Sequence, residues 1–190
     1  HHEAPEELPK AYGIINPKAP NALDEKLSTK QITSLTSLAG VGVAFKVAQA
    51  LLEKYEKLDY ISEILPYVAV GTVADLVPLV GENRYLVTKG LELISNGKHY
   101  GLTRLLDSAG YKGQITSEHI AFGIAPRINA SGRLDTVEEA LKVLIPTTNR
   151  KSKWQFKALT SLTKSVRNCV RIFLPKLMKW LKKRETETAQ

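Results

Sequence analysis

The segment Phe122-Gly-Ile-Ala-Pro-Arg127-Ile-Asn129-Ala-Ser-Gly132-Arg133-Leu134 places two guanidinium groups and an amide within seven residues. Pro126 and Gly132 interrupt an ordinary helix, so we predict a constrained turn here rather than a buried helix face. Planar, permanently charged donors on such a turn suit an anionic oxygen, most simply that of a phosphate. Two exposed arginines near a helix end would give the same sequence, so the segment alone leaves both interpretations open.

Three further segments precede it in a fixed order. They are His1-His2-Glu3 with Asn16-Pro17-Lys18 close behind, Leu38-Ala-Gly40-Val-Gly42-Val-Ala-Phe-Lys46, and Gly71-Thr72-Val73-Ala74-Asp75-Leu76-Val77-Pro78-Leu79 leading into Gly81-Glu82-Asn83-Arg84. Gly40 and Gly42 open a predicted helix, where a second backbone or a ligand can approach closely. Asp75 is the only acid from Ile64 to Val80. Such a carboxylate caps a helix, is paired, or binds a metal.

In this order the four segments resemble the RecJ-type single-stranded-DNA exonucleases of the DHH phosphoesterase family, from residue 1 to about residue 145. The resemblance implies an α/β fold, of which this chain would supply the later part of a DHH phosphoesterase domain plus connecting helices. This part is expected to be predominantly helical. The implied activity is 5′-to-3′ exonuclease hydrolysis of single-stranded DNA with two Mn²⁺ or Mg²⁺ ions, in DNA repair and recombination.

The resemblance also assigns roles to six residues. His1 and Asp75 are expected to bind metal, and His2 and Asp75 to be catalytic, with His2 contacting the scissile phosphate. The expected contacts to strand phosphates are Arg127, Asn129 and Arg133. Terminal histidines also fit a tag remnant, and Asp75 alone fits a helix cap. Most aspartate ligands of the family would lie upstream and a second domain downstream, so we expect the chain alone to be inactive.

Composition sets broader limits. The chain of 190 residues begins with His rather than Met, which predicts an internal piece of a longer protein. A single cysteine, Cys169, permits no internal disulfide and fits a cytoplasmic location. No apolar run reaches the ~18 residues of a membrane span. The expected partners are single-stranded DNA and a repair helicase or single-strand-binding protein, with no membrane, and the chain is expected to be a monomer.

The local pattern predicts a buried strand at Tyr12–Ile15 and mainly helices thereafter. Residues 20–37 are predicted to be a loop with marginal helix. The predicted helices are 41–55, 60–70 with a kink at Pro66, 83–95 ended by Asn96-Gly97, 102–108, 117–123 and 136–144. We interpret residues 1–80 as the C-terminal part of a DHH domain and 81–145 as a connecting helical region towards a second domain.

Residues 146–190 depart from the resemblance. They hold 12 of the 27 Lys and Arg but 2 of the 19 Asp and Glu, so the net charge of +8 becomes −2 without them. The codons of Met178-Lys179-Trp180, read one base earlier, force a glutamate followed by methionine or valine. Our hypothesis is that this basic tail is an out-of-frame, non-native translation. The alternative is a basic amphipathic helix with Phe173, Leu177 and Trp180 on one face, against which Pro175 argues.

Two other functions compete with the exonuclease. One is a DHH-family phosphodiesterase for oligonucleotides or cyclic dinucleotides, whose members lack the 125–133 pattern seen here. The other is a non-enzymatic nucleic-acid-binding protein that uses the basic tail, and its affinity would be lost with the tail and fall steeply with salt.

Overall fold

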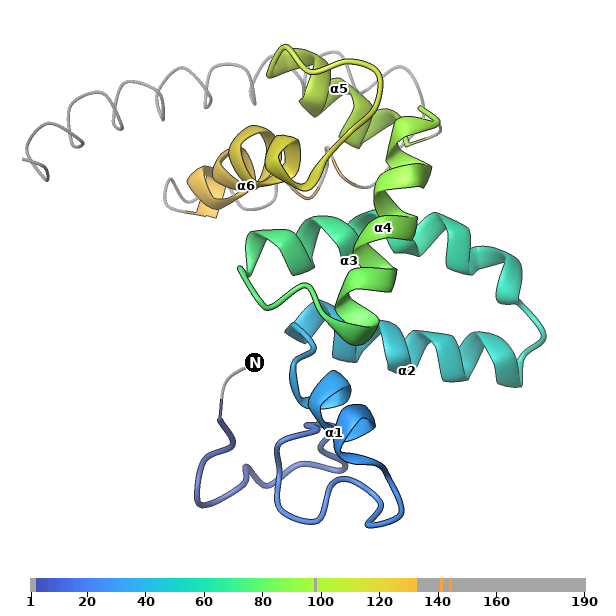
Figure 1. Ribbon diagram of the computed structural model, residues 1–190, viewed down its shortest axis with the longest axis vertical. Helices are drawn as coiled ribbons and strands as arrows, with labels where there is room; N and C mark the ends of the chain where they lie inside the picture. Colours follow the sequence, from blue (N-terminus) through green and yellow to red (C-terminus); the bar gives the residue numbers. More distant parts are fainter. Residues whose placement is uncertain (1–2, 98, 133–140, 142–143, 145–190) are drawn as a thin grey trace, which may run out of the picture. The chain divides into compact units, whose positions relative to one another are not determined.

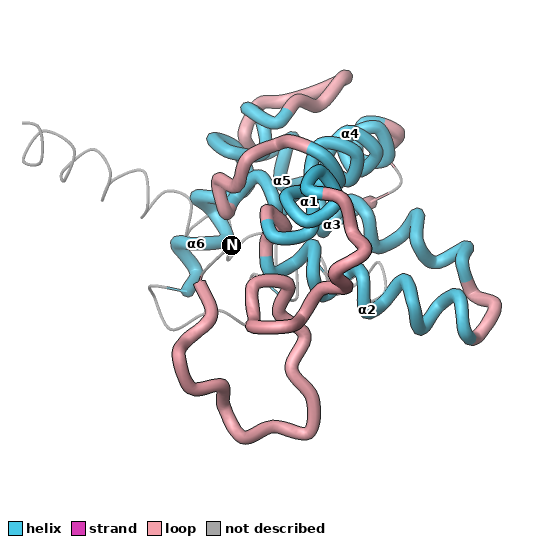
Figure 2. Tube along the Cα trace, turned by 60° about the horizontal axis from the view of Figure 1, so that its bottom comes forward, coloured by secondary structure: helices cyan, strands magenta, loops and turns pink. Residues whose placement is uncertain are grey.

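The computed structural model describes residues 3–97, 99–132, 141 and 144, and its regular elements there are all helical (Figure 2). Residues 1–125 form one compact unit, and residues 126–190 belong to a second unit. The first unit contains α1 (Thr29–Thr36), α2 (Gly40–Lys54), the 3₁₀ turn η1 (Leu58–Tyr60), α3 (Ile61–Ala74), α4 (Gly81–Ser95), α5 (Tyr100–Ser108) and the π-helix η2 (His119–Ile124). Helix α6 (Ala125–Gly132) begins at the boundary. The prediction of a chiefly helical chain is confirmed for these residues.

Helix α3 is the centre of the first unit. It packs against α4 and α2, and α4 crosses it (Figure 1). The apolar core here contains Leu38, Phe45, Leu65, Val68 and Leu86. Helices α5 and η2 pack together and bury a further set of side chains, Leu102, Leu105, Leu106, Ile120 and Ile124.

The close contact between α3 and α4 depends on glycine at position 90. Gly90 of α4 is buried, and a Cβ at this position would lie 2.6 Å from the carbonyl oxygen of Leu65 on α3. It would also overlap the Cβ of Ala69. The backbones therefore approach more closely than any other residue at position 90 would allow.

Most predicted helices are present with shifted ends. Helices α2, α4 and α5 begin one or two residues before their predicted starts, and α3 continues to Ala74 through the buried Pro66 without ending there. Helix α4 stops at Asn96 and Gly97 as predicted, with Gly97 at φ 71°. The marginal helix within 20–37 is α1, which has a capping box between Ser28 and Gln31.

The predicted strand at Tyr12–Ile15 is wrong in this structure. The segment is a loop, and its apolar side chains are exposed, with Ile15 at 65%. A strand needs a neighbour to pair its backbone N–H and C=O groups, and the described residues contain no strand that could do so. The local pattern therefore could not form a strand by itself.

The predicted interruption at Pro126 is also wrong. Residues 117–132 are helical throughout, and Pro126 is the second residue of α6. The turn before it is the π-helix η2. A π-turn breaks the regular i→i−4 pattern of hydrogen bonds, which removes the need for the N–H that proline lacks. Arg127 and Asn129 thus lie on a helix and not on a turn.

The predicted helix 136–144, except positions 141 and 144, and the tail 146–190 lie outside the described residues.

Within the described part, no single helix is long and apolar enough to span a membrane. Only α1 and α2 taken together, bent by 108°, meet that test of length and composition.

Candidate functional site

Three of the sequence segments meet around one open pocket of the first unit, with a volume of about 410 Å³. Asn16, Pro17 and Lys18 line one side, and Leu38 and Gly40 come from the α1–α2 junction. Asp75 joins them from the end of α3. The remaining lining residues are Ile15, Leu35, Thr36 and Val43. Residues about sixty positions apart in the sequence therefore share one concave surface, which is the usual form of a binding site.

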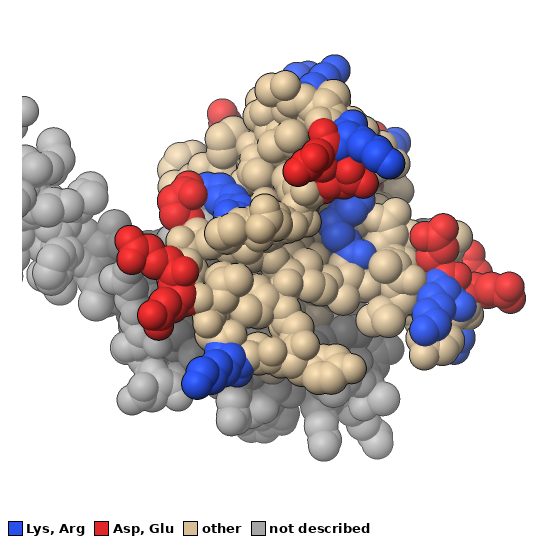
Figure 3. Space-filling model, turned by 90° about the horizontal axis from the view of Figure 1, so that it is seen from below, with Lys and Arg blue, Asp and Glu red and all other residues tan. Residues whose placement is uncertain are grey.

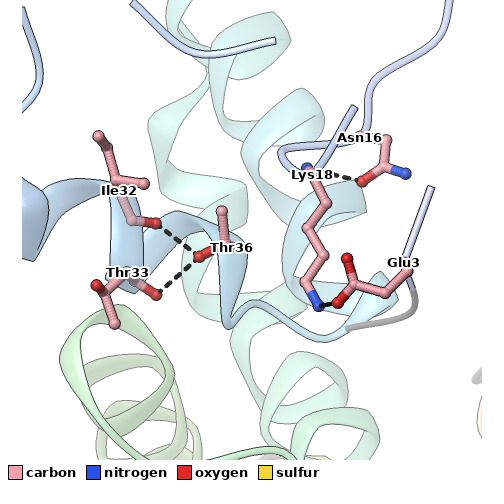
Figure 4. A network of polar contacts seen from close by, with 6 residues as sticks. All are labelled: Glu3, Asn16, Lys18, Ile32, Thr33 and Thr36. Atoms are coloured by element: carbon pink, nitrogen blue, oxygen red, sulfur yellow. Dashed lines mark hydrogen bonds and ion pairs between the residues drawn. The ribbon is translucent and has the colours of Figure 1, made fainter. Parts of the chain in front are cut away.

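The Asn16–Lys18 side of the pocket is held by local polar contacts (Figure 4). The backbone N–H of Lys18 donates to Asn16 Oδ1 at 3.0 Å, which shapes the turn after the loop. The Lys18 ammonium donates to Glu3 Oε1 at 2.6 Å, so Glu3, the residue after His2, lies beside the pocket. This hydrogen bond and the positive charge of Lys18 lower the pKa of the Glu3 carboxyl.

Asp75 lies at the C-cap of α3, and its backbone N–H donates to the carbonyl of Gly71 at 3.0 Å. Its side chain is exposed. The next residue, Leu76, has φ 56°, in the left-handed region that disfavours a non-glycine residue. The chain thus turns sharply away from the helix immediately after the carboxylate.

The glycines of the second segment have different roles. A Cβ at Gly40 would meet no heavy atom within 4 Å, so this lining position opens to the pocket. A Cβ at Gly42 would lie 3.1 Å from Leu38 Cδ2. Gly42 therefore serves the packing of α2 against the junction, and Gly40 is the one that faces open space.

The other predicted site residues are not among the described residues of the first unit. Arg127, half-buried, and Asn129, exposed, are on α6 in the second unit. His1, His2 and Arg133 lie outside the described residues. On the face of Figure 3, lysine and arginine side chains alternate with aspartate and glutamate among the coloured residues. The described surface there offers individual cations rather than a continuous basic strip.

A divalent ion would find one carboxylate ligand in this pocket. The Asp75 carboxylate is a hard oxygen donor, and the amide of Asn16 is a second possible oxygen. Among the described residues no group of three or more His, Cys, Asp or Glu side chains comes together. The donor chemistry fits, but the described residues do not complete a coordination shell.

Sequence reasoning gave no site role to Lys18, although it lies in a quoted segment. The sequence signal that could have indicated Lys18 is an Asn-Pro turn followed directly by a lysine. The lining residues Leu35, Thr36 and Val43 carry no such signal, because only the tertiary fold brings them to the pocket.

No protein-family model matches the chain. It is 40% identical over 146 residues to the single-stranded-DNA-specific exonuclease RecJ of Bacillus subtilis (strain 168), a match that covers 76% of this chain and 17% of that protein. The RecJ proteins of Escherichia coli (strain K12) and Thermus thermophilus are 37% and 38% identical over 157 and 144 residues, again 76% of this chain and 26% and 20% of theirs.

Solved structures give the same picture. The crystal structure of Thermus thermophilus RecJ in complex with Mn²⁺ aligns with a TM-score of 0.66 and 37% identity, covering 75% of this chain and 22% of that one. A second, exonuclease RecJ bound to manganese, aligns with a TM-score of 0.68 and 34% identity, covering 84% and 39%.

The fold of the described residues matches part of the DHH fold of the RecJ structures. Within that class, the chain matches the RecJ family of single-stranded-DNA-specific exonucleases in both sequence and fold. It spans between 17% and 26% of the length of the curated relatives named above.

Proposed function

We propose that this chain is part of a 5′-to-3′ exonuclease that hydrolyses phosphodiester bonds of single-stranded DNA in repair and recombination. The observation that carries the proposal is the pocket at which Asn16–Lys18, Leu38–Gly40 and Asp75 meet. Manganese or magnesium would supply charge neutralisation and an activated water there. By this proposal residues 1–80 form the C-terminal part of a DHH domain, residues 81–145 connect it towards a second domain, and residues 146–190 are non-native.

Asp75 would be a metal ligand and a catalytic residue. Its position supports this role, because a carboxylate at a helix C-terminus faces the negative end of the helix dipole and gains nothing as a cap. Strained backbone beside an exposed carboxylate is also typical of functional sites. The capping alternative left open by the sequence therefore has little physical support at this end of α3.

Lys18 would hold the pocket's positive charge. Lys18 lines the pocket and its ammonium is paired with Glu3, which keeps the side chain in place while reducing its net field. His1 would be a second metal ligand and His2 a phosphate contact. Arg127, Asn129 and Arg133 would hold backbone phosphates, which positions the strand without reading its sequence.

We propose a cytoplasmic protein that acts on single-stranded DNA as a monomer, alongside a repair helicase or a single-strand-binding protein. The chain itself should be inactive on DNA, since one carboxylate in the described pocket is fewer than a two-metal site requires.

The function can be tested in a chimaera in which residues 1–145 replace the matching segment of Thermus thermophilus RecJ. We expect Mn²⁺-dependent digestion of labelled single-stranded DNA. Asp75→Asn should lower the rate on the order of 100-fold or more, because it removes a charge needed in the transition state. Asp107→Asn, at an exposed position on α5, is the matched control. A folded chimaera with no activity, or equal rates for both variants, contradicts the proposal.

The phosphate role of Arg127 is tested in the same chimaera by binding. Arg127→Ala should weaken binding equally across DNA sequences and reduce the salt slope by about one, while Arg127→Lys recovers only part of the loss. If Arg127 only stabilises α6, the melting temperature falls and the salt slope stays unchanged.

A further inference from the structure

Three consecutive residues at the start of α4, Gly81, Glu82 and Asn83, do not line the pocket but contact residues next to two of its three sides, the α1–α2 junction and the Asp75 connection. We call them the Gly81–Asn83 clasp. Asn83 is 0% exposed, an unusual environment for a primary amide. Its Nδ2 donates to two carbonyl oxygens, that of Ser37 at 2.7 Å and that of Pro78 at 3.0 Å. Because both partners are acceptors, the orientation of the amide is determined by its contacts.

The two carbonyls belong to the two segments that carry the pocket. Ser37 ends α1 and directly precedes Leu38, which lines the pocket. Pro78 lies three residues after Asp75, on the connection between α3 and α4. A single buried side chain therefore bridges the α1–α2 junction and the Asp75 connection.

The other two residues of the clasp fix the same junction. The backbone N–H of Glu82 donates to Ser34 Oγ at 2.9 Å, which satisfies one of the free N–H groups of the first turn of α4. Gly81 has φ 53°, and a Cβ there would lie 2.9 Å from Ser34 Cβ. Glu82 Oε1 accepts from Lys46 Nζ of α2 at 3.0 Å.

We propose that the Gly81–Asn83 clasp sets the separation between the α1–α2 junction and the Asp75 connection, so that Asn83 is the positioning residue for Asp75. It acts through Pro78 and Ser37 and touches no reacting group. The role of this clasp rests on the proposed function of Asp75, but the geometry can be tested without metal or DNA.

The test is native-state hydrogen exchange on the full 190-residue chain, well below its melting temperature. Asn83→Ala and the similarly sized Asn83→Leu both remove the two donated hydrogen bonds. Each should raise exchange roughly tenfold in both loop segments, 37–39 and 76–80, relative to amides of α3 such as those of Val68 and Val70.

Two controls separate positioning from general stability. Gly90→Ala disturbs the α3–α4 contact away from the clasp and should raise exchange in the α3 core without preference for the two loops. Asn96→Ala removes an exposed amide at the end of α4 and should change exchange neither in the two loops nor in the α3 core. Faster exchange in only one loop, or an Asn83→Ala pattern equal to that of Gly90→Ala, overturns the proposal.

Ser34→Ala is used if both Asn83 variants fail to fold. It removes only the acceptor of the Glu82 N–H and should raise exchange of the Glu82 amide and of residues 37–39, again relative to the α3 core. A uniform rise across α3 and α4 would refute the clasp. If the clasp proposal is refuted, the expected effect of Asp75→Asn in the chimaera still stands. The two proposals can therefore be refuted independently.

Discussion

At the scale of single residues, the least expected feature is Leu76. It lies directly after Asp75 with φ 56°, and its side chain is 84% exposed. A left-handed leucine has an unfavourable backbone energy and gains little from burial here. The turn that presents Asp75 is therefore held in place by its surroundings, including the Pro78 carbonyl contact with Asn83.

Leu76→Gly should stabilise the folded chain. Leu76→Ala is the matched control, because it removes the same exposed side chain but keeps the strained Cβ. We expect the glycine variant to be more stable than the alanine variant by about 1 kcal/mol, measured by thermal or urea unfolding. Equal stabilities would show that φ 56° carries no strain at this position.

Glu3 should titrate below the ordinary glutamate pKa of 4.5, because Lys18 donates a hydrogen bond to its carboxylate. A lowered folded pKa means that the pair stabilises the fold above the unfolded pKa and that this contribution disappears as the pH falls through the folded value. Lys18→Met should return the Glu3 pKa towards 4.5, read from carboxyl carbon shifts by NMR. An unchanged Glu3 pKa in that variant would show that Lys18 does not cause the shift.

At the scale of elements, the α3–α4 contact is a close approach of two backbones. Gly90→Ala should lower the free energy of unfolding by about 1–3 kcal/mol, because overpacking outweighs the better helix propensity of alanine. Gly40→Ala is the control on α2, where no atom lies within 4 Å of the added Cβ, and should change stability by less than about 0.5 kcal/mol. Similar losses for both would mean that α3 and α4 do not approach this closely.

Helices were predictable from the sequence where apolar residues repeat at helical spacing, as in α2 and α4. The strand at Tyr12–Ile15 was not, because strand formation depends on pairing partners that no local pattern reveals. The predicted interruption at Pro126 was wrong for a related reason. The π-turn that accommodates it is a property of the preceding helix and not of the proline itself.

At the scale of the whole molecule, the pocket joins segments that the sequence could only place in order. Asp75 was singled out by its isolation among apolar residues, and it lines the pocket, while its role stays a prediction. Lys18 was missed as a site residue, and Asn83 was quoted only as part of a motif. Their contacts, to Glu3 in one case and to Ser37 and Pro78 in the other, depend on tertiary folding alone.

Binding of the catalytic metal by Asp75 is measured most directly by anomalous scattering from crystals of the Thermus chimaera soaked in Mn²⁺. We predict an anomalous peak roughly 2.0–2.3 Å from an Asp75 carboxylate oxygen, which is lost in Asp75→Asn. Manganese bound entirely by other residues, with the Asp75 carboxylate more than about 4 Å from every peak, would contradict this role of Asp75.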